Sequence, residues 1–287
     1  MGYLMQENAN LAPYCSMKVG GNAKYLVLPK TEKQLTDAIK DFSQKGEKYI
    51  IAGNCSNLVF SDKGFDGAVI LTSGVRGISL EEGIITAYCG ETLSTLARFA
   101  MDNSISGFEF CYGIPGTVGG AVYMNAGAYG GEICQRFISG EFLDENLNRI
   151  TVLAEEMDFG HRKSRMMSEK WILLSAKFSC VTGNKTEIRN KMDELMACRK
   201  AKQPLDYPSC GSAFKRPEGH FAGALIEQCG LKGYRIGGAM VSEKHAGFII
   251  NYENAAATDV IELLKSVHDI VLEKTGVELE PEIRVIE

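Results

Sequence analysis

The chain has 287 residues, of which 45% are hydrophobic and 23% charged, a composition typical of a soluble globular protein with one large or two smaller domains. Its formal net charge is −5 and it contains no Lys/Arg-rich run, which disfavours nucleic acid and anionic membranes as main partners and favours a small anionic metabolite. No apolar run approaches the ~20 residues that span a bilayer, and the N-terminus lacks the features of a signal peptide. We therefore expect a cytoplasmic protein without membrane insertion.

Apolar periodicity predicts alternating strands and helices through the first two thirds of the chain. The helix that begins at Thr31 has the clearest start, because Thr31 and Gln34 have the spacing of a capping box, and Gly46 marks its end. Strands are expected at residues 24–28, 49–52, 67–71, 83–89 and 171–181, a hairpin over 137–153 with its turn near Asp144 and Asn148, and further helices at 92–102 and 186–202.

Two stretches of small residues carry the first indication of a ligand. The turn at 53–57 (GNCSN) follows a strand, where α/β sheets commonly bind ligands, although the G-x-G-x-x-G of a Rossmann dinucleotide site is absent. The stretch 113–127 (GIPGTVGGAVYMNAG) is rich in glycine, which lets a ligand approach the main chain closely. Thr117 offers a hydroxyl there, and Pro115 suits the first position of a short helix whose amides favour a pyrophosphate. These residues alone leave open a phosphate cradle or a tight packing turn.

The rest of the chain indicates a second lobe. Pro204 follows a charged helix, and beyond it we expect a turn over 207–219, a helix ended by Gly230, a strand pair around 236–250, a helix over 258–275 and a last strand at 279–286. The expected division is one domain over 1–203, with subdomains at about 1–73 and 74–203, and a lobe over 204–287 whose last strand returns to the first domain. The nine cysteines show no metal or disulfide spacing, so most are expected to be buried small residues.

Taken in order, these stretches resemble one family over nearly the whole chain, the enolpyruvyl-UDP-N-acetylglucosamine reductases (the MurB family) of peptidoglycan precursor synthesis. Several ordered motifs are more specific than any single one, and the short length suggests the shorter (type II) subtype. The motifs are SMKVGG at 16–21, GNCSN at 53–57, GIPGTVGGAVYMNAGAYGGEI at 113–133, HRKS at 161–164, GSAFKRP at 211–217, VSEKHAGFIIN at 241–251 and LEPEIRVI at 279–286.

The resemblance implies an α+β fold of the vanillyl-alcohol-oxidase type, in which two N-terminal subdomains hold FAD and a C-terminal lobe closes the substrate site. Some relatives of this fold attach FAD covalently to a histidine of the N-terminal subdomain. Because no histidine precedes His161 in this chain, noncovalent FAD is expected. The residues that the resemblance places at FAD are Gly53, Asn54, Cys55, Ser56, Asn57, Gly113, Pro115, Gly116, Thr117, Gly119, Gly120, Asn125, Ala126 and Gly127.

The resemblance also implies a reaction in which NADPH reduces the flavin and the UDP-sugar enol ether then takes a hydride at C3 and a proton at C2. Arg162 and Glu282 would stabilise charge at the substrate carboxylate, with Glu280 beside Glu282 on one face of a strand, and Ser212 would donate the proton. Ser209 is the nearest competitor of Ser212. Substrate contacts are expected from His161, Lys215 and Arg216, and the protein is expected to be a monomer.

The sequence departs from the family pattern at a few positions. The family usually has glycines where this chain has Asn54 and Cys55, and a tyrosine where it has His161. Cysteine adopts positive φ less readily than asparagine. Two alternatives remain open: another flavin enzyme of the same fold, such as a sugar or lactone oxidase, and a nucleotide-binding regulatory protein that has lost the chemistry.

Overall fold

The helix with the clearest sequence start is present in the computed structural model, which describes residues 2–287. Helix α1 (Glu32–Gln44) follows Thr31, whose hydroxyl accepts a hydrogen bond from the amide of Gln34 at 3.2 Å. The side chain of Gln34 accepts from the amide of Lys30 and so does not complete the reciprocal capping box. The predicted apolar face is buried and consists of Leu35, Ala38, Ile39 and Phe42.

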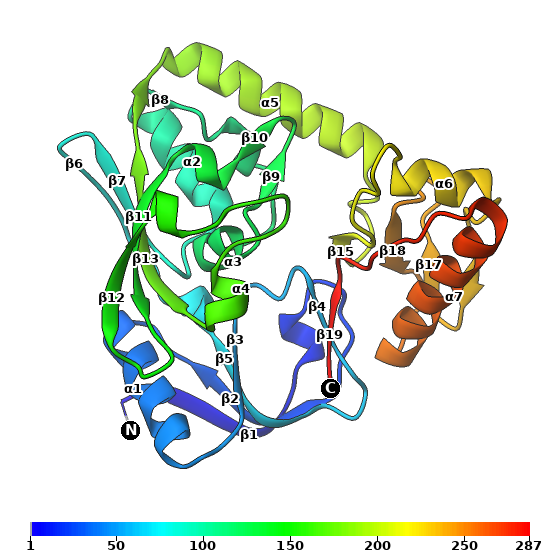
Figure 1. Cartoon of the computed structure of the whole chain (residues 1–287), viewed down its shortest axis with the longest axis horizontal. Helices are drawn as coiled ribbons and strands as arrows, with labels where there is room; N and C mark the ends of the chain where they lie inside the picture. Colours follow the sequence, from blue (N-terminus) through cyan, green and yellow to red (C-terminus); the bar gives the residue numbers. More distant parts are fainter. Residues whose placement is uncertain (1) are drawn as a thin grey trace. The chain divides into compact units, whose positions relative to one another are not determined.

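The described chain divides into two units, and the first comprises residues 2–6, 26–54 and 68–199. Its main sheet has the strand order β12-β11-β13-β7-β6 (Figure 1). These strands are β6 (Ile78–Glu81), β7 (Ile84–Tyr88), β11 (Phe137–Leu143), β12 (Arg149–Leu153) and β13 (Ile172–Ser179). The helices of this part are α1, α2 (Leu93–Asp102), α3 (Val118–Tyr123), α4 (Met166–Glu169) and α5 (Lys185–Lys202), and its short strands are β8 (Ile105–Ser106), β9 (Gly127–Ala128), β10 (Gly131–Glu132) and β14 (Val181–Thr182).

The predicted hairpin is confirmed. Strands β11 and β12 pair antiparallel, and the carboxylate of Asp144 closes their turn by accepting hydrogen bonds from the amides of Asn146 at 2.9 Å and Asn148 at 2.7 Å. Helix α3 packs against β13 and β7 of the same sheet. This packing holds α3, which lies within the glycine-rich stretch 113–127, against the main sheet.

The second unit comprises residues 7–25, 55–67 and 200–287. Helix α7 (Ala257–Thr275) packs on a sheet of order β15-β18-β17-β16 and on helix α6 (Ala222–Gln228). The strands are β15 (Ser209–Ser212), β16 (Arg235–Ile236), β17 (Ala239–Val241) and β18 (Phe248–Asn251), and a parallel pair joins β4 (Leu58–Phe60) to β19 (Arg284–Ile286). Its core also includes Met17, Val19 and Val59 from early in the chain.

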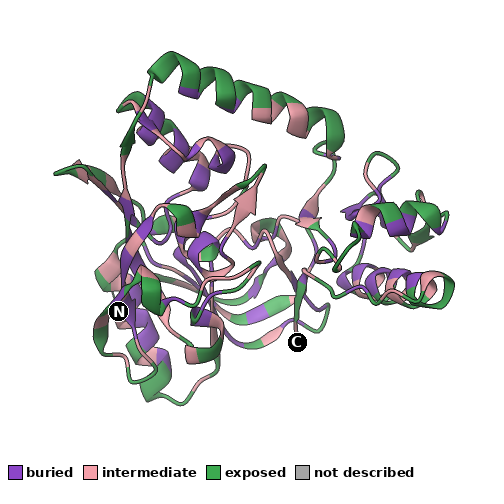
Figure 2. Ribbon diagram, turned by 45° about the horizontal axis from the view of Figure 1, so that its top comes forward, coloured by how far each residue is buried: buried purple, intermediate pink, exposed green. Residues whose placement is uncertain are grey.

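Three strands carry the chain between the units: β1 (Leu4–Asn10), β2 (Asn22–Leu28) and β5 (Phe65–Leu71), in a sheet of order β1-β2-β5-β3 with β3 (Tyr49–Ala52). Figure 2 shows buried positions along these sheets and a largely exposed α5, in which only Ile188 and Met192 are buried. The domain limits expected from the sequence remain a prediction. Six of the nine cysteines are buried, as expected.

A carboxylate from the early part of the chain caps the N-terminus of α7. Asp62 accepts hydrogen bonds from the amides of Ala257 at 2.9 Å and Thr258 at 2.8 Å, and from the Thr258 hydroxyl at 2.7 Å. Desolvation alone would raise the pKa of Asp62, but these hydrogen bonds outweigh it and hold the pKa below its usual value. A charge at a helix N-terminus is also favoured by the helix dipole.

We expect Asp62→Ala to lower the free energy of unfolding by about 0.5–2 kcal/mol, the usual range for loss of a helix N-cap. Because the folded pKa of Asp62 is depressed, its contribution is fully present above the unfolded pKa of about 3.9 and is lost as pH falls through the folded pKa. Urea unfolding at several pH values measures both effects. Asp206→Ala, which removes an exposed carboxylate of the same unit, is the control, and an equal loss in both variants would contradict the cap.

Candidate active site

The two glycine-containing stretches meet within the first unit. A Cβ atom added to Gly53 would lie 2.2 Å from the Oγ1 atom of Thr117, so no side chain larger than hydrogen fits between them. The side-chain amide of Asn54 donates a hydrogen bond to the carbonyl of Pro115 at 3.1 Å. The first part of the turn 53–57 and the loop before α3 therefore form one surface, as the prediction of a cradle with two sides requires.

Helix α3 begins later than the sequence suggested. Thr117 is its N-cap and Val118 its first residue, so Pro115 precedes the helix instead of opening it. The hydroxyl of Thr117 is buried and accepts from the amide of Gly120 at 3.4 Å. Both Pro115 and Thr117 are residues typical of a helix start. Thr117 has the extended backbone of an N-cap and its hydroxyl accepts a hydrogen bond from the first turn, so the helix begins after it.

The glycines of the loop 113–120 have different surroundings. Gly119 packs on Cys89, because an added Cβ would lie 3.1 Å from the Cys89 carbonyl oxygen, whereas Gly120 is exposed. Within residues 2–287 the amide of Gly116 donates to no protein acceptor, which leaves it available to an anionic oxygen. Gly113 packs against Arg199 of α5, where an added Cβ would lie 2.9 Å from Cδ.

Cys55 has the backbone conformation that favours the glycine of the family pattern. Its φ angle is +46°, a conformation that glycine or asparagine adopts more readily, while Asn54 is not among the positive-φ residues. The side chain of Cys55 is buried, and its thiol is hydrogen-bonded to the thiol of Cys15. This hydrogen bond lowers the pKa of Cys15 below its usual value. The thiol therefore packs inward, and Ser56 and Asn57 follow it in the turn.

A second set of contacts links Arg162 to the end of the glycine-rich stretch. The guanidinium of Arg162 donates to the carbonyl of Gly127 at 3.0 Å. Asn125 is buried, and its side-chain amide donates to the carbonyl of Gly160 at 3.0 Å and to Glu132 at 3.1 Å. These hydrogen bonds hold loop 125–127, which includes Ala126, against the turn at 160–163. The side chain of Asn125 is one of the groups that connect the two segments.

Ser212 and Glu282 lie on neighbouring segments of the second unit. Ser212 is the exposed last residue of β15, a strand where a turn had been expected. The amide of Glu282 donates to the carbonyl of Ala213 at 2.9 Å, and the amide of Lys215 donates to the carbonyl of Glu280 at 2.8 Å. The expected strand 279–286 is shorter, β19, preceded by a bridge between Phe214 and Pro281.

The three predicted substrate contacts have different surroundings. Lys215 forms an ion pair with Glu280, the carboxylate that the sequence had placed beside Glu282. The guanidinium of Arg216 stacks 4.0 Å from the ring centre of Phe221, and His161 is exposed in the other unit. Lys215 and Arg216 line a pocket of about 480 Å³ together with Pro217, Glu218, His220, Gly276, Val277, Glu278 and Glu280.

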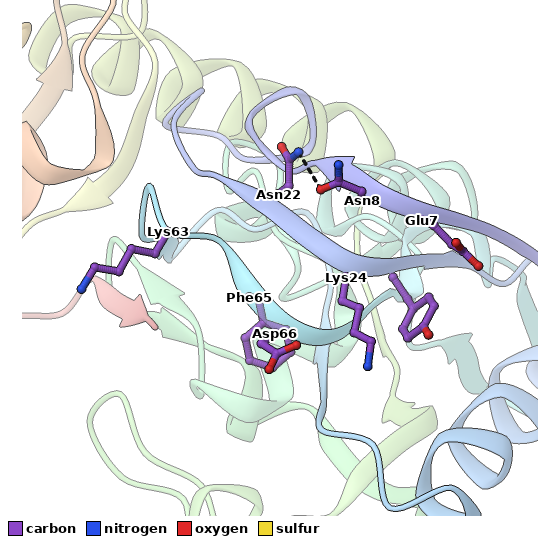
Figure 3. A pocket seen from close by; sticks show the side chains of 8 residues that line it. Glu7, Asn8, Asn22, Lys24, Lys63, Phe65 and Asp66 are labelled. Atoms are coloured by element: carbon purple, nitrogen blue, oxygen red, sulfur yellow. Dashed lines mark hydrogen bonds between the residues drawn. The ribbon is translucent and has the colours of Figure 1, made fainter.

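Sequence reasoning missed Arg199, whose burial lowers the pKa of its guanidinium. Its position near the end of the charged helix α5 gave no sign of contact with Gly113. A further pocket of about 460 Å³ contains none of the predicted site residues (Figure 3). Exposed side chains of both charges line it, and two of its lining residues are hydrogen-bonded to each other, the side-chain amide of Asn22 donating to Asn8 at 2.9 Å.

Comparison with known proteins identifies the family. Residues 203–286 match the family model of the UDP-N-acetylenolpyruvoylglucosamine reductase C-terminal domain, and residues 23–146 match an FAD binding domain. A relative from Caldicellulosiruptor bescii, named UDP-N-acetylenolpyruvoylglucosamine reductase, is 49% identical over 278 residues, which are 96% of this chain and 88% of the relative. The chain belongs to the UDP-N-acetylenolpyruvoylglucosamine reductase family.

Other members of the reductase family support the same assignment. The reductase of Lactococcus lactis subsp. cremoris is 46% identical over 283 residues, covering 99% of this chain and 95% of the relative. The crystal structure of the Thermus caldophilus enzyme superposes with a TM-score of 0.84 at 33% identity, covering all of both chains.

Family membership confirms the resemblance found in the sequence, the α+β FAD-binding fold, and assignment to a class of FAD-dependent oxidoreductases. Within residues 2–287, no helix combines the length and apolar character needed to cross a membrane.

Proposed function

We propose that the protein reduces UDP-N-acetylglucosamine enolpyruvate to UDP-N-acetylmuramate, with noncovalent FAD as cofactor and NADPH as reductant. The observation that carries this proposal is the short hydrogen-bonded ladder between residues 213–215 and 280–282, which holds Ser212 and Glu282 on adjacent segments. Neither a sugar oxidase nor a lactone oxidase needs that pair. Family membership supports the substrate, because the relatives are named for it.

The residues fit FAD. Gly53 has no side chain at its close contact with Thr117, and the amide of Gly116, which donates to no protein acceptor within residues 2–287, suits a diphosphate oxygen. We propose that the predicted residues of 53–57, 113–120 and 125–127 hold the cofactor mainly through their backbone, with Thr117 and Asn125 shaping the loops. FAD bound there would supply the hydride chemistry that converts the enol ether into a lactyl ether.

The chain's own residues would stabilise the charge and move the proton. We assign Arg162 and Glu282 to the substrate carboxylate, where each preorganised donor is worth about 3–4 kcal/mol as negative charge develops. Ser212 would give its hydroxyl proton to C2 while C3 receives the hydride. Overall, one NADPH and one proton are consumed for each C2–C3 double bond reduced.

The UDP portion of the substrate needs contacts of its own. We assign Lys215 and Arg216 to the diphosphate and His161 to the substrate as well. Lys215 would exchange Glu280 for a phosphate, an exchange that a flexible lysine allows, and Arg216 can keep its stacking on Phe221 while offering its remaining donors. We also expect a monomer.

Stoichiometry tests the function. Purified protein with FAD should oxidise NADPH only when the UDP-enolpyruvyl sugar is added, one NADPH per sugar, and mass spectrometry should show a product heavier by two hydrogens. NADH in place of NADPH measures the coenzyme preference. Oxygen consumption driven by simple sugars or lactones, with no response to the UDP-sugar, would instead support an oxidase of the same fold.

A further inference from the structure

The two asparagines of the turn 53–57 have different hydrogen-bonding partners. Asn54 donates its side-chain amide to Pro115 in the glycine-rich stretch of the first unit, at 3.1 Å. Asn57 donates its side-chain amide to the backbone carbonyl of Glu282 in the second unit, at 3.0 Å. The same residue type, three positions apart, thus contacts a cofactor loop in one case and the proposed catalytic glutamate in the other.

Asn57 contacts the Glu282 segment twice. Besides the side-chain bond, its carbonyl accepts from the amide of Arg284 at 3.0 Å, directly before the parallel pairing of Leu58 with Arg284. On its other edge the segment is held by the bond from the Glu282 amide to Ala213. Glu282 therefore lies where the chain changes from pairing with 213–215 to pairing with β4, and the Asn57 side chain is hydrogen-bonded to the backbone at this point.

We propose that Asn57 is a positioning residue that sets the orientation of Glu282 for reduction of the substrate. The inference rests on the proposed role of Glu282 and extends it, since the sequence had placed Asn57 only at FAD. A carbonyl that loses its donor lets the backbone of Glu282 turn, and its carboxyl group moves with it. Small displacements of a catalytic group reduce rates by roughly 10²-fold.

The test separates the two halves of the reaction in the full-length protein with FAD. Because the turn 53–57 is proposed to hold FAD mainly through its backbone, and the Asn57 side chain points to Glu282 instead, Asn57→Ala should largely retain FAD and its reduction by NADPH. It should slow flavin reoxidation by the enolpyruvyl substrate by about 10–100-fold. Asn54→Ala, the matched change in the same turn, should mainly weaken FAD retention. Asn57→Gln keeps an amide donor and should recover part of the reoxidation rate. If the alanine variant does not fold, Asn57→Asp replaces it, because it keeps the size of the side chain but loses the donor.

A double-mutant cycle with Glu282→Gln shows whether Asn57 acts through Glu282. If it does, Asn57→Ala has little further effect on reoxidation in the Glu282→Gln background. The pH dependence of reoxidation should change when Asn57→Ala is made in the protein that has Glu282, and should not change further when it is added to Glu282→Gln. Additive effects, or equal losses in both half-reactions, would overturn the inference. If Glu282→Gln by itself leaves reoxidation unchanged, the role of Glu282 is wrong and the inference falls with it. If only Asn57→Ala is without effect, the proposed function stands and Asn57 is not a positioning residue.

Discussion

Ser212→Ala is expected to leave flavin reduction by NADPH unchanged and to slow flavin reoxidation by the UDP-enolpyruvyl sugar by about 10²–10⁴-fold, the usual contribution of a positioned general acid. Ser212 is exposed at the end of β15, while the nearby Cys210 and Ala213 are buried, so loss of its hydroxyl removes no core contact. Anaerobic stopped-flow absorbance at the flavin band measures each half-reaction separately.

Ser209→Ala is the matched control, because Ser209 lies on the same strand and was the competing candidate for the proton donor. It should affect neither half-reaction strongly. If Ser212→Ala slows flavin reduction as much as reoxidation, Ser212 serves the structure or the cofactor and is not the C2 acid. If Ser209→Ala alone slows reoxidation, the assignment belongs to Ser209.

Gly53→Ala is expected to weaken FAD binding by about 10–100-fold, because overpacking a tight contact costs roughly 1–3 kcal/mol. The added Cβ would lie 2.2 Å from Thr117 Oγ1 and 3.1 Å from Cγ2, so either the turn or the N-cap of α3 must move. Flavin absorbance per protein after gel filtration, and titration of the apoprotein with FAD, measure the loss.

Gly46→Ala separates cofactor loss from general destabilisation. Gly46 has φ +66° and no atom near an added Cβ, so its replacement strains the backbone at the end of α1 without touching the cradle. The control should lower the unfolding temperature and keep FAD. Full FAD content in Gly53→Ala would show that the contact with Thr117 does not shape the cofactor site.

Local patterns predicted the long elements well. The helices α1, α2 and α7 have strong apolar or capping signals, and α5 is a long charged run that ends before Pro204. The hairpin turn at Asp144 closes through side-chain bonds only a few residues apart. The sequence does not predict β4, β6 or the exposed edge strand β1. β4 and β6 have only three and four residues, too few to show a period, and β1 is mostly polar. The Pro and Gly residues in and around β15 are typical turn residues, so the sequence predicts a turn where the structure has a strand.

Motifs predict residues for the chemistry of the site, but they do not predict the contacts that hold those residues in place. Ser212, Arg162 and Glu282 stand in recognisable patterns, and their catalytic roles stay predictions. The bond from Asn57 to Glu282 joins residues 225 positions apart, and the cap of α7 by Asp62 joins residues 195 apart. A single sequence contains no pattern for such contacts, since they arise only when the early strands fold against the last segment.

The most direct test of the central claim uses the enzyme without NADPH. The FAD-loaded protein is reduced chemically under anaerobic conditions and then mixed with UDP-N-acetylglucosamine enolpyruvate. We predict full return of the oxidised flavin absorbance and one UDP-N-acetylmuramate formed per flavin. A flavin that stays reduced in the presence of this substrate would contradict the account.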